Sequence, residues 1–233
     1  MRELDEFIAE LKQSFGERLL SVVVFGSNAN REKDLVKSNV DLMLIFDKFS
    51  GEDLQRISPL AKKWIKAKNP YPIMMGLEEF YSSKDVYALE YSDIKWNYEI
   101  IYGQDYITNL PIMAGDLRFQ AEREVKALLM KLRGFYLQYG NNSKSLREAL
   151  LRTIKSVLVV FRAILRLRGV QPSVYKKDLI YQISEVFNID VDIYQILLAE
   201  KEKRTHIKSC DLRKIYLKTV NHLASLLLVI DKM

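Results

Sequence analysis

The residues with the clearest chemical potential lie in the stretch FGSNANREKDLVKSNVDLMLIF, from position 25 to position 46. Gly26 and Ser27 close an apolar run, and this pair lets backbone N–H groups and a hydroxyl approach a phosphate closely. Asn39 and Asp41 open the next apolar run, and on a strand their side chains point to the same face. Side chains placed in this way can hold a divalent metal, as metal-assisted phosphoryl transfer requires.

Two short runs rich in β-branched and aromatic residues flank this polar loop, over 19–25 and 40–46. Both runs are apolar almost throughout, which is typical of strands buried on both faces. Periodic patterns around them predict helices over 3–16 and 51–68 and further strands over 71–75 and 86–94.

From about residue 113 the strand signals end and long helical patterns take over. The predicted helices cover 116–139, 144–168, 176–187, 191–203 and 208–231. We therefore expect an α+β domain over residues 1–110, followed by an all-α helical bundle domain over residues 111–233.

Composition narrows the class of protein. The 233 residues are 48% hydrophobic and 28% charged, which is ordinary for a globular chain. The net charge of +6 favours anionic partners, but 36 basic against 30 acidic residues is a mild imbalance. The single cysteine, Cys210, excludes an internal disulfide. Neither a secretory signal nor a membrane-spanning run is visible, so we expect a cytoplasmic protein without a membrane partner.

Two stretches of the sequence resemble a known family. Gly26-Ser27, a polar loop of roughly ten residues and Ser38-Asn39-Val40-Asp41-Leu42 are similar to the signature of the polymerase-beta-like nucleotidyltransferase superfamily. That signature is Gly-Ser followed by Ser-Asp-hydrophobic-Asp-hydrophobic. A second stretch, from KDVYALEYSDIK to IIYGQD over 84–105, resembles a pattern of uncharacterised bacterial and archaeal members. With the segment between them, the two stretches span most of residues 20 to 107.

The resemblance implies a small mixed sheet with helices on one side, and a helical domain placed as in kanamycin nucleotidyltransferase. It implies an enzyme that transfers a nucleoside monophosphate from an NTP, with ATP favoured, to an acceptor hydroxyl and releases pyrophosphate. Mg²⁺ is the implied cofactor. A small molecule or a protein would supply the hydroxyl, nucleic acid is a less favoured acceptor, and a homodimer is left open.

The resemblance also assigns roles to individual residues. Asp41 would bind the metal and act in catalysis, with Asn39 as a second metal ligand. For the third carboxylate, which also binds the metal and can act as general base, Glu90 is the first choice and Asp93 the reserve. A surface-facing strand position is an almost equal alternative for Glu90. The implied substrate contacts are Gly26, Ser27, Ser38 and Asn39.

Asn39 departs from the family pattern, because an aspartate is expected at that position. Its amide oxygen can coordinate a cation but supplies no negative charge. Losses at metal sites commonly weaken binding or activity by about 10–100-fold. The chain would then be a natural pseudoenzyme, a working variant with another acid in place of Asn39, or a protein with an introduced substitution. Asp47 is a poor replacement, since it lies roughly 20 Å along the strand from Asp41. The alternative function is an inactive nucleotide-binding or protein-partner module.

Four basic residues recur on one face of the helix predicted over 144–168. Such a stripe is usually a solvated helix face. If it lined a cleft instead, it would attract a triphosphate or nucleic acid. The four residues are Arg152, Lys155, Arg162 and Arg166.

Overall fold

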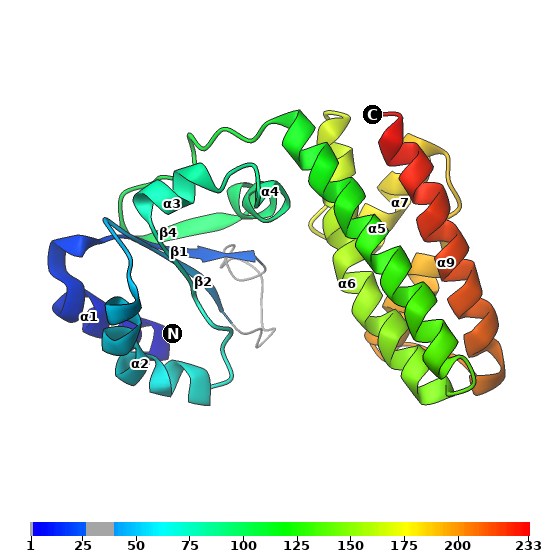
Figure 1. Ribbon diagram of the computed structural model, residues 1–233, viewed down its shortest axis with the longest axis horizontal. Helices are drawn as coiled ribbons and strands as arrows, with labels where there is room; N and C mark the ends of the chain where they lie inside the picture. The colour runs from blue at the N-terminus through cyan, green and yellow to red at the C-terminus, as the bar shows by residue number, and fades with distance from the viewer. Residues whose placement is uncertain (1, 27–39) are drawn as a thin grey trace. The chain divides into compact units, whose positions relative to one another are not determined.

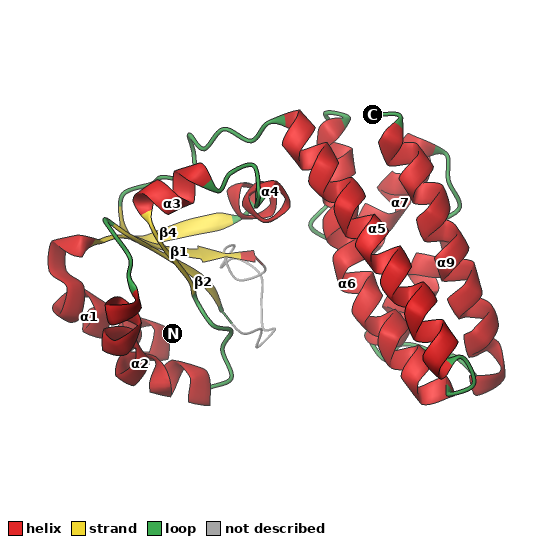
Figure 2. Ribbon diagram, viewed as in Figure 1, coloured by secondary structure: helices red, strands yellow, loops and turns green. Residues whose placement is uncertain are grey.

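The computed structural model describes residues 2–26 and 40–233 (Figure 1). The chain forms two compact units, Met1–Ile112 and Met113–Met233. The first combines a sheet with helices and the second is built from helices (Figure 2). The predicted fold class, an α+β domain followed by a helical domain, is therefore confirmed.

The first unit is organised around a four-stranded mixed sheet. Its strands are β1 (Leu19–Phe25), β2 (Asp41–Phe46), β3 (Ile73–Gly76) and β4 (Tyr98–Gly103), in the spatial order β3-β2-β1-β4. The central strand β1 runs antiparallel to both β2 and β4, whereas β2 runs parallel to β3. The predicted strands over 19–25 and 40–46 are thus confirmed, and they are neighbours in the sheet.

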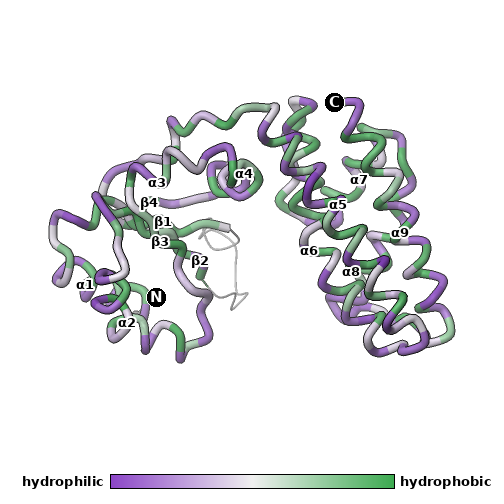
Figure 3. Tube along the Cα trace, in the orientation of Figure 1, coloured by the Kyte–Doolittle hydropathy of each residue, from purple (hydrophilic) through white to green (hydrophobic). Residues whose placement is uncertain are grey.

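Helices cover both faces of this sheet. Alternate residues of β1 and β2 point to opposite faces, and nearly all are buried, so each face needs an apolar cover. Trp64 packs on one face and Phe80 on the other. The expectation of helices on one side only is therefore wrong. The trace along β1 and β2 is mostly green in Figure 3, which marks the hydrophobic character of these two strands. The covering helices are α1 (Arg2–Phe15) and α2 (Gly51–Lys66) on one face, and α3 (Leu77–Ser82) and α4 (Ala88–Trp96) on the other.

The strand predicted over 86–94 is instead the helix α4, and the strand that follows it, β4, was not predicted. The buried residues of α4 include Ala88, Tyr91 and Ile94, which recur every three residues as on one face of a helix. This short apolar segment therefore fits the helical period as well as it fits a strand. The prediction that Glu90 stands within a strand is wrong as well.

A charged network joins the start of β1 to the start of α2. Arg18 Nη1 and Nη2 donate to the two carboxylate oxygens of Asp53 at 2.9 and 3.0 Å. The same carboxylate accepts from the Ser50 backbone N–H at 3.0 Å, which completes a capping box at the start of α2. Asp53 is almost fully buried, so this carboxylate depends on Arg18 for its charge balance.

Asp53→Asn is expected to remove an acid-sensitive contribution to stability. The hydrogen bonds from Arg18 hold the pKa of Asp53 below its ordinary value. The carboxylate therefore stabilises the folded state above the unfolded pKa, about 4, and this contribution is lost as the pH falls through the lower folded pKa. Urea unfolding should show the wild type losing stability below about pH 4 more steeply than Asp53→Asn. Asp47→Asn, which removes the more exposed partner of Arg18, is the control. An identical pH profile for wild type and Asp53→Asn would contradict the prediction.

The second unit contains the five helices predicted from residue 113 onward, and each ends within two residues of its predicted limits. The long helices α5, α6 and α9 pack against one another, and α7 and α8 pack on α6. Within the described residues, none of the helices combines the length and the apolar character needed to cross a membrane. The five helices are α5 (Ala114–Tyr139), α6 (Ser143–Leu167), α7 (Lys176–Phe187), α8 (Asp192–Lys201) and α9 (Ser209–Asp231).

Candidate active site

The paired ends of β1 and β2 bring Gly26 against Asp41. Phe25, the last residue of β1, pairs with Asp41, the first residue of β2. Gly26 then turns away with a φ of +74°, in the left-handed region that favours glycine. A Cβ on Gly26 would lie 3.2 Å from Oδ2 of Asp41. The backbone of the turn thus runs directly along the Asp41 carboxylate. A side chain at position 26 would crowd this carboxylate.

Asn97 holds the Gly26 turn in place. The Gly26 N–H donates to the Asn97 carbonyl oxygen at 3.1 Å, and the Asn97 side-chain amide donates to the Gly26 carbonyl oxygen. Asn97 connects α4 to β4, and the next residue, Tyr98, pairs with Phe25. Asn97 is therefore a positioning residue for the turn. Asn97 was not among the predicted site residues, although it lies within the second family-like stretch.

Asn69 holds the backbone just before Asp41. The Val40 N–H donates to Oδ1 of Asn69 at 3.3 Å, and the Asn69 amide nitrogen donates to the Trp64 carbonyl oxygen at 3.3 Å. The indole N–H of Trp64 donates in turn to the carbonyl oxygen of Pro70 at 2.8 Å. In the sequence, Asn69 and Pro70 indicated only the end of a helix. In the structure, this connection also fixes the start of β2.

The two candidates for the third carboxylate lie on α4. Glu90 is exposed and Asp93 is half-buried. Glu90 and Asp93 are spaced i and i+3, so they lie on one face of α4, and Asn97 is the residue that follows the end of this helix. At a rise of 1.5 Å per residue, Asp93 lies about 6 Å and Glu90 about 10 Å along the axis from Asn97. Asp93 is therefore nearer than Glu90 to Asn97, the residue that hydrogen-bonds to Gly26.

The donor atoms at this site are oxygens, which suit a hard cation such as Mg²⁺. Asp41 contributes a carboxylate, whereas Ser27, Ser38 and Asn39 lie outside the described residues. Across residues 2–26 and 40–233, no three Asp, Glu, His or Cys side chains gather closely enough to hold a metal ion. Asp47 is no substitute for Asn39, because it lies past the far end of β2 and pairs with Arg18 at 3.3 Å.

The fold of the chain is similar to that of a solved structure, although its sequence matches no family model. No protein-family model matches the sequence, and no curated protein matches it either. Among solved structures, the chain is similar to spectinomycin adenyltransferase AAD(9) from Enterococcus faecialis, determined with ATP and spectinomycin. The TM-score is 0.57 at 16% identity, over 97% of this chain and 98% of that one. This likeness shows that the chain has the fold of a nucleotidyltransferase, so the family resemblance read from the motifs is confirmed at the level of fold.

Proposed function

We propose that this chain, which has the fold of a nucleotidyltransferase, transfers a nucleoside monophosphate from an NTP to an acceptor hydroxyl. The observation that carries the proposal is the left-handed Gly26 turn, which runs along the Asp41 carboxylate at the paired ends of β1 and β2. The Gly26 N–H itself donates to Asn97, so the N–H groups that would bind phosphates beside this acidic metal ligand are those of the residues that follow Gly26. Likeness to an adenyltransferase over nearly the whole chain supports the same activity.

Each residue has a separate task in the proposed reaction. The Gly26 turn, with Ser27 and Ser38, would bind the triphosphate of the NTP. Asp41 and Asn39 would hold Mg²⁺ through their side-chain oxygens, and the bound cation would neutralise charge on the phosphates. The acceptor oxygen forms a bond to the α-phosphorus while the bond to the pyrophosphate oxygen breaks. Catalysis would then depend chiefly on positioning and on charge neutralisation.

A carboxylate on α4 would take the proton from the acceptor hydroxyl and complete the metal site. Glu90 was the first choice from the sequence, but Asp93 suits the role better, because it is half-buried and one helical turn from Asn97. We propose a small molecule as the source of the hydroxyl, with a protein side chain as the second choice. ATP is the proposed NTP.

Asp41→Ala is expected to abolish the effect of Mg²⁺ on ATP binding. Isothermal titration of the full chain with ATP and GTP, with and without Mg²⁺, measures this effect. In the wild type, Mg²⁺ should strengthen ATP binding by about 10–100-fold, since the cation joins the phosphates to Asp41. Asp47→Ala is the matched control, because it removes the same type of side chain past the far end of β2. Metal-independent ATP binding by the wild type would overturn the catalytic proposal.

Asn39 favours a second candidate function, an inactive nucleotide-binding or protein-partner module. An amide in place of a carboxylate leaves the metal site with less negative charge. The same titration on Asn39→Asp, together with pyrophosphate release, separates the two functions. An impaired enzyme should gain both Mg²⁺ affinity and turnover from the added charge. A module that has lost catalysis would gain affinity without turnover.

A further inference from the structure

The two units differ sharply in charge. Met1–Ile112 contains 14 basic and 18 acidic residues, a net charge of −4. Met113–Met233 contains 22 basic and 12 acidic residues, a net charge of +10. The mild overall charge of +6 therefore conceals a strongly basic helical unit. A basic surplus confined to one unit favours a polyanionic partner for that unit.

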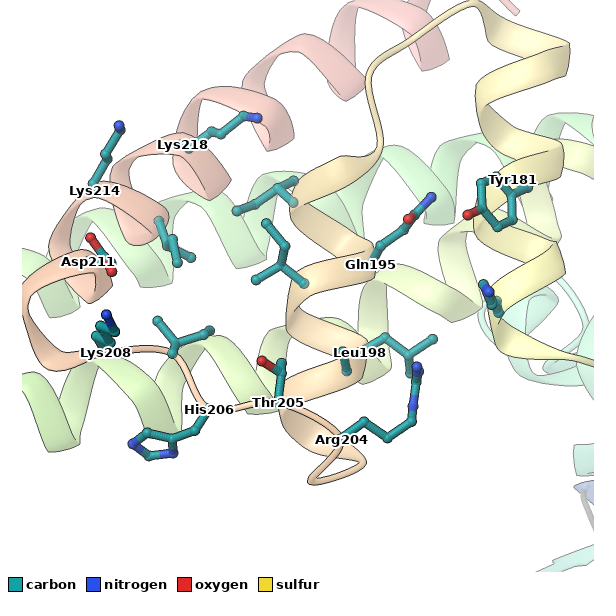
Figure 4. Close-up of a pocket in the computed structure, with 16 residues that line it drawn as sticks. Tyr181, Gln195, Leu198, Arg204, Thr205, His206, Lys208, Asp211, Lys214 and Lys218 are labelled. Atoms are coloured by element: carbon teal, nitrogen blue, oxygen red, sulfur yellow. The ribbon is translucent and has the colours of Figure 1, made fainter.

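A groove in the helical unit gathers part of this charge. It has a volume of about 840 Å³ and lies among α7, α8, α9 and the connection between α8 and α9 (Figure 4). Asp211 is the acidic residue of its lining, which has a net charge of +4 with His206 neutral. The groove is therefore a local concentration of positive charge. Its basic residues are Lys177, Arg204, Lys208, Lys214 and Lys218.

Three of these side chains are available to an anion. Arg204 donates to Glu202 at 2.9 Å, and Lys218 pairs with Asp190 at 3.2 Å. Among the ion pairs formed within the described part of the chain, none involves the other three basic residues of the groove. These three are Lys177, Lys208 and Lys214. Asp211 lines the same groove, but no ion pair within the described residues joins it to any of the three.

The positive field extends beyond the groove lining. Lys201, at the end of α8, donates to the Leu151 carbonyl oxygen at 3.2 Å. Its pKa is lowered by burial and by the positive charges of Lys155 and Lys176. Cations from α6, α7 and α8 are thus close enough to repel one another.

The groove also offers an aromatic ring and an apolar surface. Tyr181 is 45% exposed as a residue and lines the groove, with the Lys177 ammonium 5.9 Å from the ring centroid. Ile196 is 39% exposed at the same site. From Lys208 to Lys214 the unpaired lysines span about 9 Å along α9, which exceeds the reach of a single anionic group. A ligand with spaced negative charges and flat rings suits this lining.

We propose that this groove binds single-stranded nucleic acid. Phosphates would lie along Lys177, Lys208 and Lys214, and a base would stack on Tyr181. The proposal does not depend on the catalytic function. It also differs from the basic stripe predicted on α6, where Arg152 already pairs with Glu148 at 4.0 Å.

Fluorescence anisotropy of the full chain with labelled 20-nucleotide U and dT strands tests the proposal. Three phosphate contacts predict that log K falls with log salt at a slope of about −2. The double variant Lys177→Glu/Lys214→Glu should bind at least about tenfold more weakly than the wild type. Its control, Lys131→Glu/Lys144→Glu, makes the same change in net charge at exposed positions outside the groove and should lose less than about threefold.

The aromatic contribution is tested in the same assay. Tyr181→Ala should weaken binding about tenfold, whereas Tyr181→Phe keeps the ring and should bind like the wild type. Circular dichroism checks that each variant folds. The proposal is overturned if the wild type does not bind either strand at 50 mM salt, if both charge variants lose affinity equally, or if Tyr181→Ala has no effect. Equal competition by poly-glutamate would identify an acidic peptide groove instead. Comparison of the two strands shows whether the groove distinguishes RNA from DNA.

Discussion

Replacing Gly26 with valine is expected to weaken Mg²⁺-dependent ATP binding by about 100-fold. Gly26 has a φ of +74°, and its missing Cβ would lie 3.2 Å from Oδ2 of Asp41. A branched side chain would therefore strain the turn and displace the carboxylate proposed to bind the metal. It would also disturb the two hydrogen bonds that Asn97 makes to this turn. Isothermal titration with ATP and Mg²⁺ measures the loss.

Gly16→Val is the matched control for this substitution. Gly16 has a φ of +54°, but nothing lies within 4 Å of the position that its Cβ would take. Both variants should therefore lose similar stability from backbone strain, about 1–2 kcal/mol, while only Gly26→Val loses ATP affinity. If Gly16→Val lost affinity to the same extent, general destabilisation would explain the effect and the role of the Gly26 turn would be refuted.

Replacing Gly103 with alanine is expected to lower the free energy of unfolding by at least about 3 kcal/mol. A Cβ on Gly103 would lie 1.9 Å from the Leu20 carbonyl oxygen and 2.8 Å from the Leu20 carbonyl carbon. Both atoms belong to the backbone of β1, and the Gln104 N–H donates to the same oxygen at 3.1 Å. The clash can be relieved only by separating β4 from β1, since no side chain can move aside.

The two tryptophans make this loss measurable in one unit. Trp64 and Trp96 are the only tryptophans in the sequence, and both belong to Met1–Ile112. Urea unfolding followed by tryptophan fluorescence therefore reports on that unit. Gly169→Ala is the control, because Gly169 has a φ of +70° in open space within the helical unit. It should leave the fluorescence transition unchanged. A Gly103→Ala transition at the wild-type midpoint would contradict the prediction.

The central strands and the Gly26–Asp41 pair could be predicted from the sequence because their signals are local. A run such as Leu19–Phe25, apolar at successive positions, has few alternatives to a strand covered on both faces. The long amphipathic helices of the second unit are predictable for the same reason. The structure of the segment around Glu90 could not be predicted, since its short apolar run matches both a strand and a helix. Its packing against both Phe80 and β1 decides the outcome, and this packing is not encoded locally.

The two asparagines that position the site could not be predicted. Asn97 and Asn69 act through hydrogen bonds to backbone groups that are distant in sequence, at Gly26 and Val40. An asparagine near a helix end normally indicates only a cap or a turn. The backbone group to which such an asparagine binds depends on which strand the fold places beside it. Asn39 lies outside the described residues. Its effect on metal binding and turnover therefore stays a prediction, which the titrations of Asn39→Asp test.

The hydrogen bonds of Asn69 have an evolutionary consequence. They join the last turn of α2, through the buried Trp64, to the residue that precedes Asp41. The placement of the acid therefore depends on a segment after α2 that has no nucleotide chemistry of its own. A related chain that kept Asp41 but replaced Asn69 with an apolar residue would need another group to accept the Val40 N–H. Surveys of such chains for lost activity should include this connection as well as the motif.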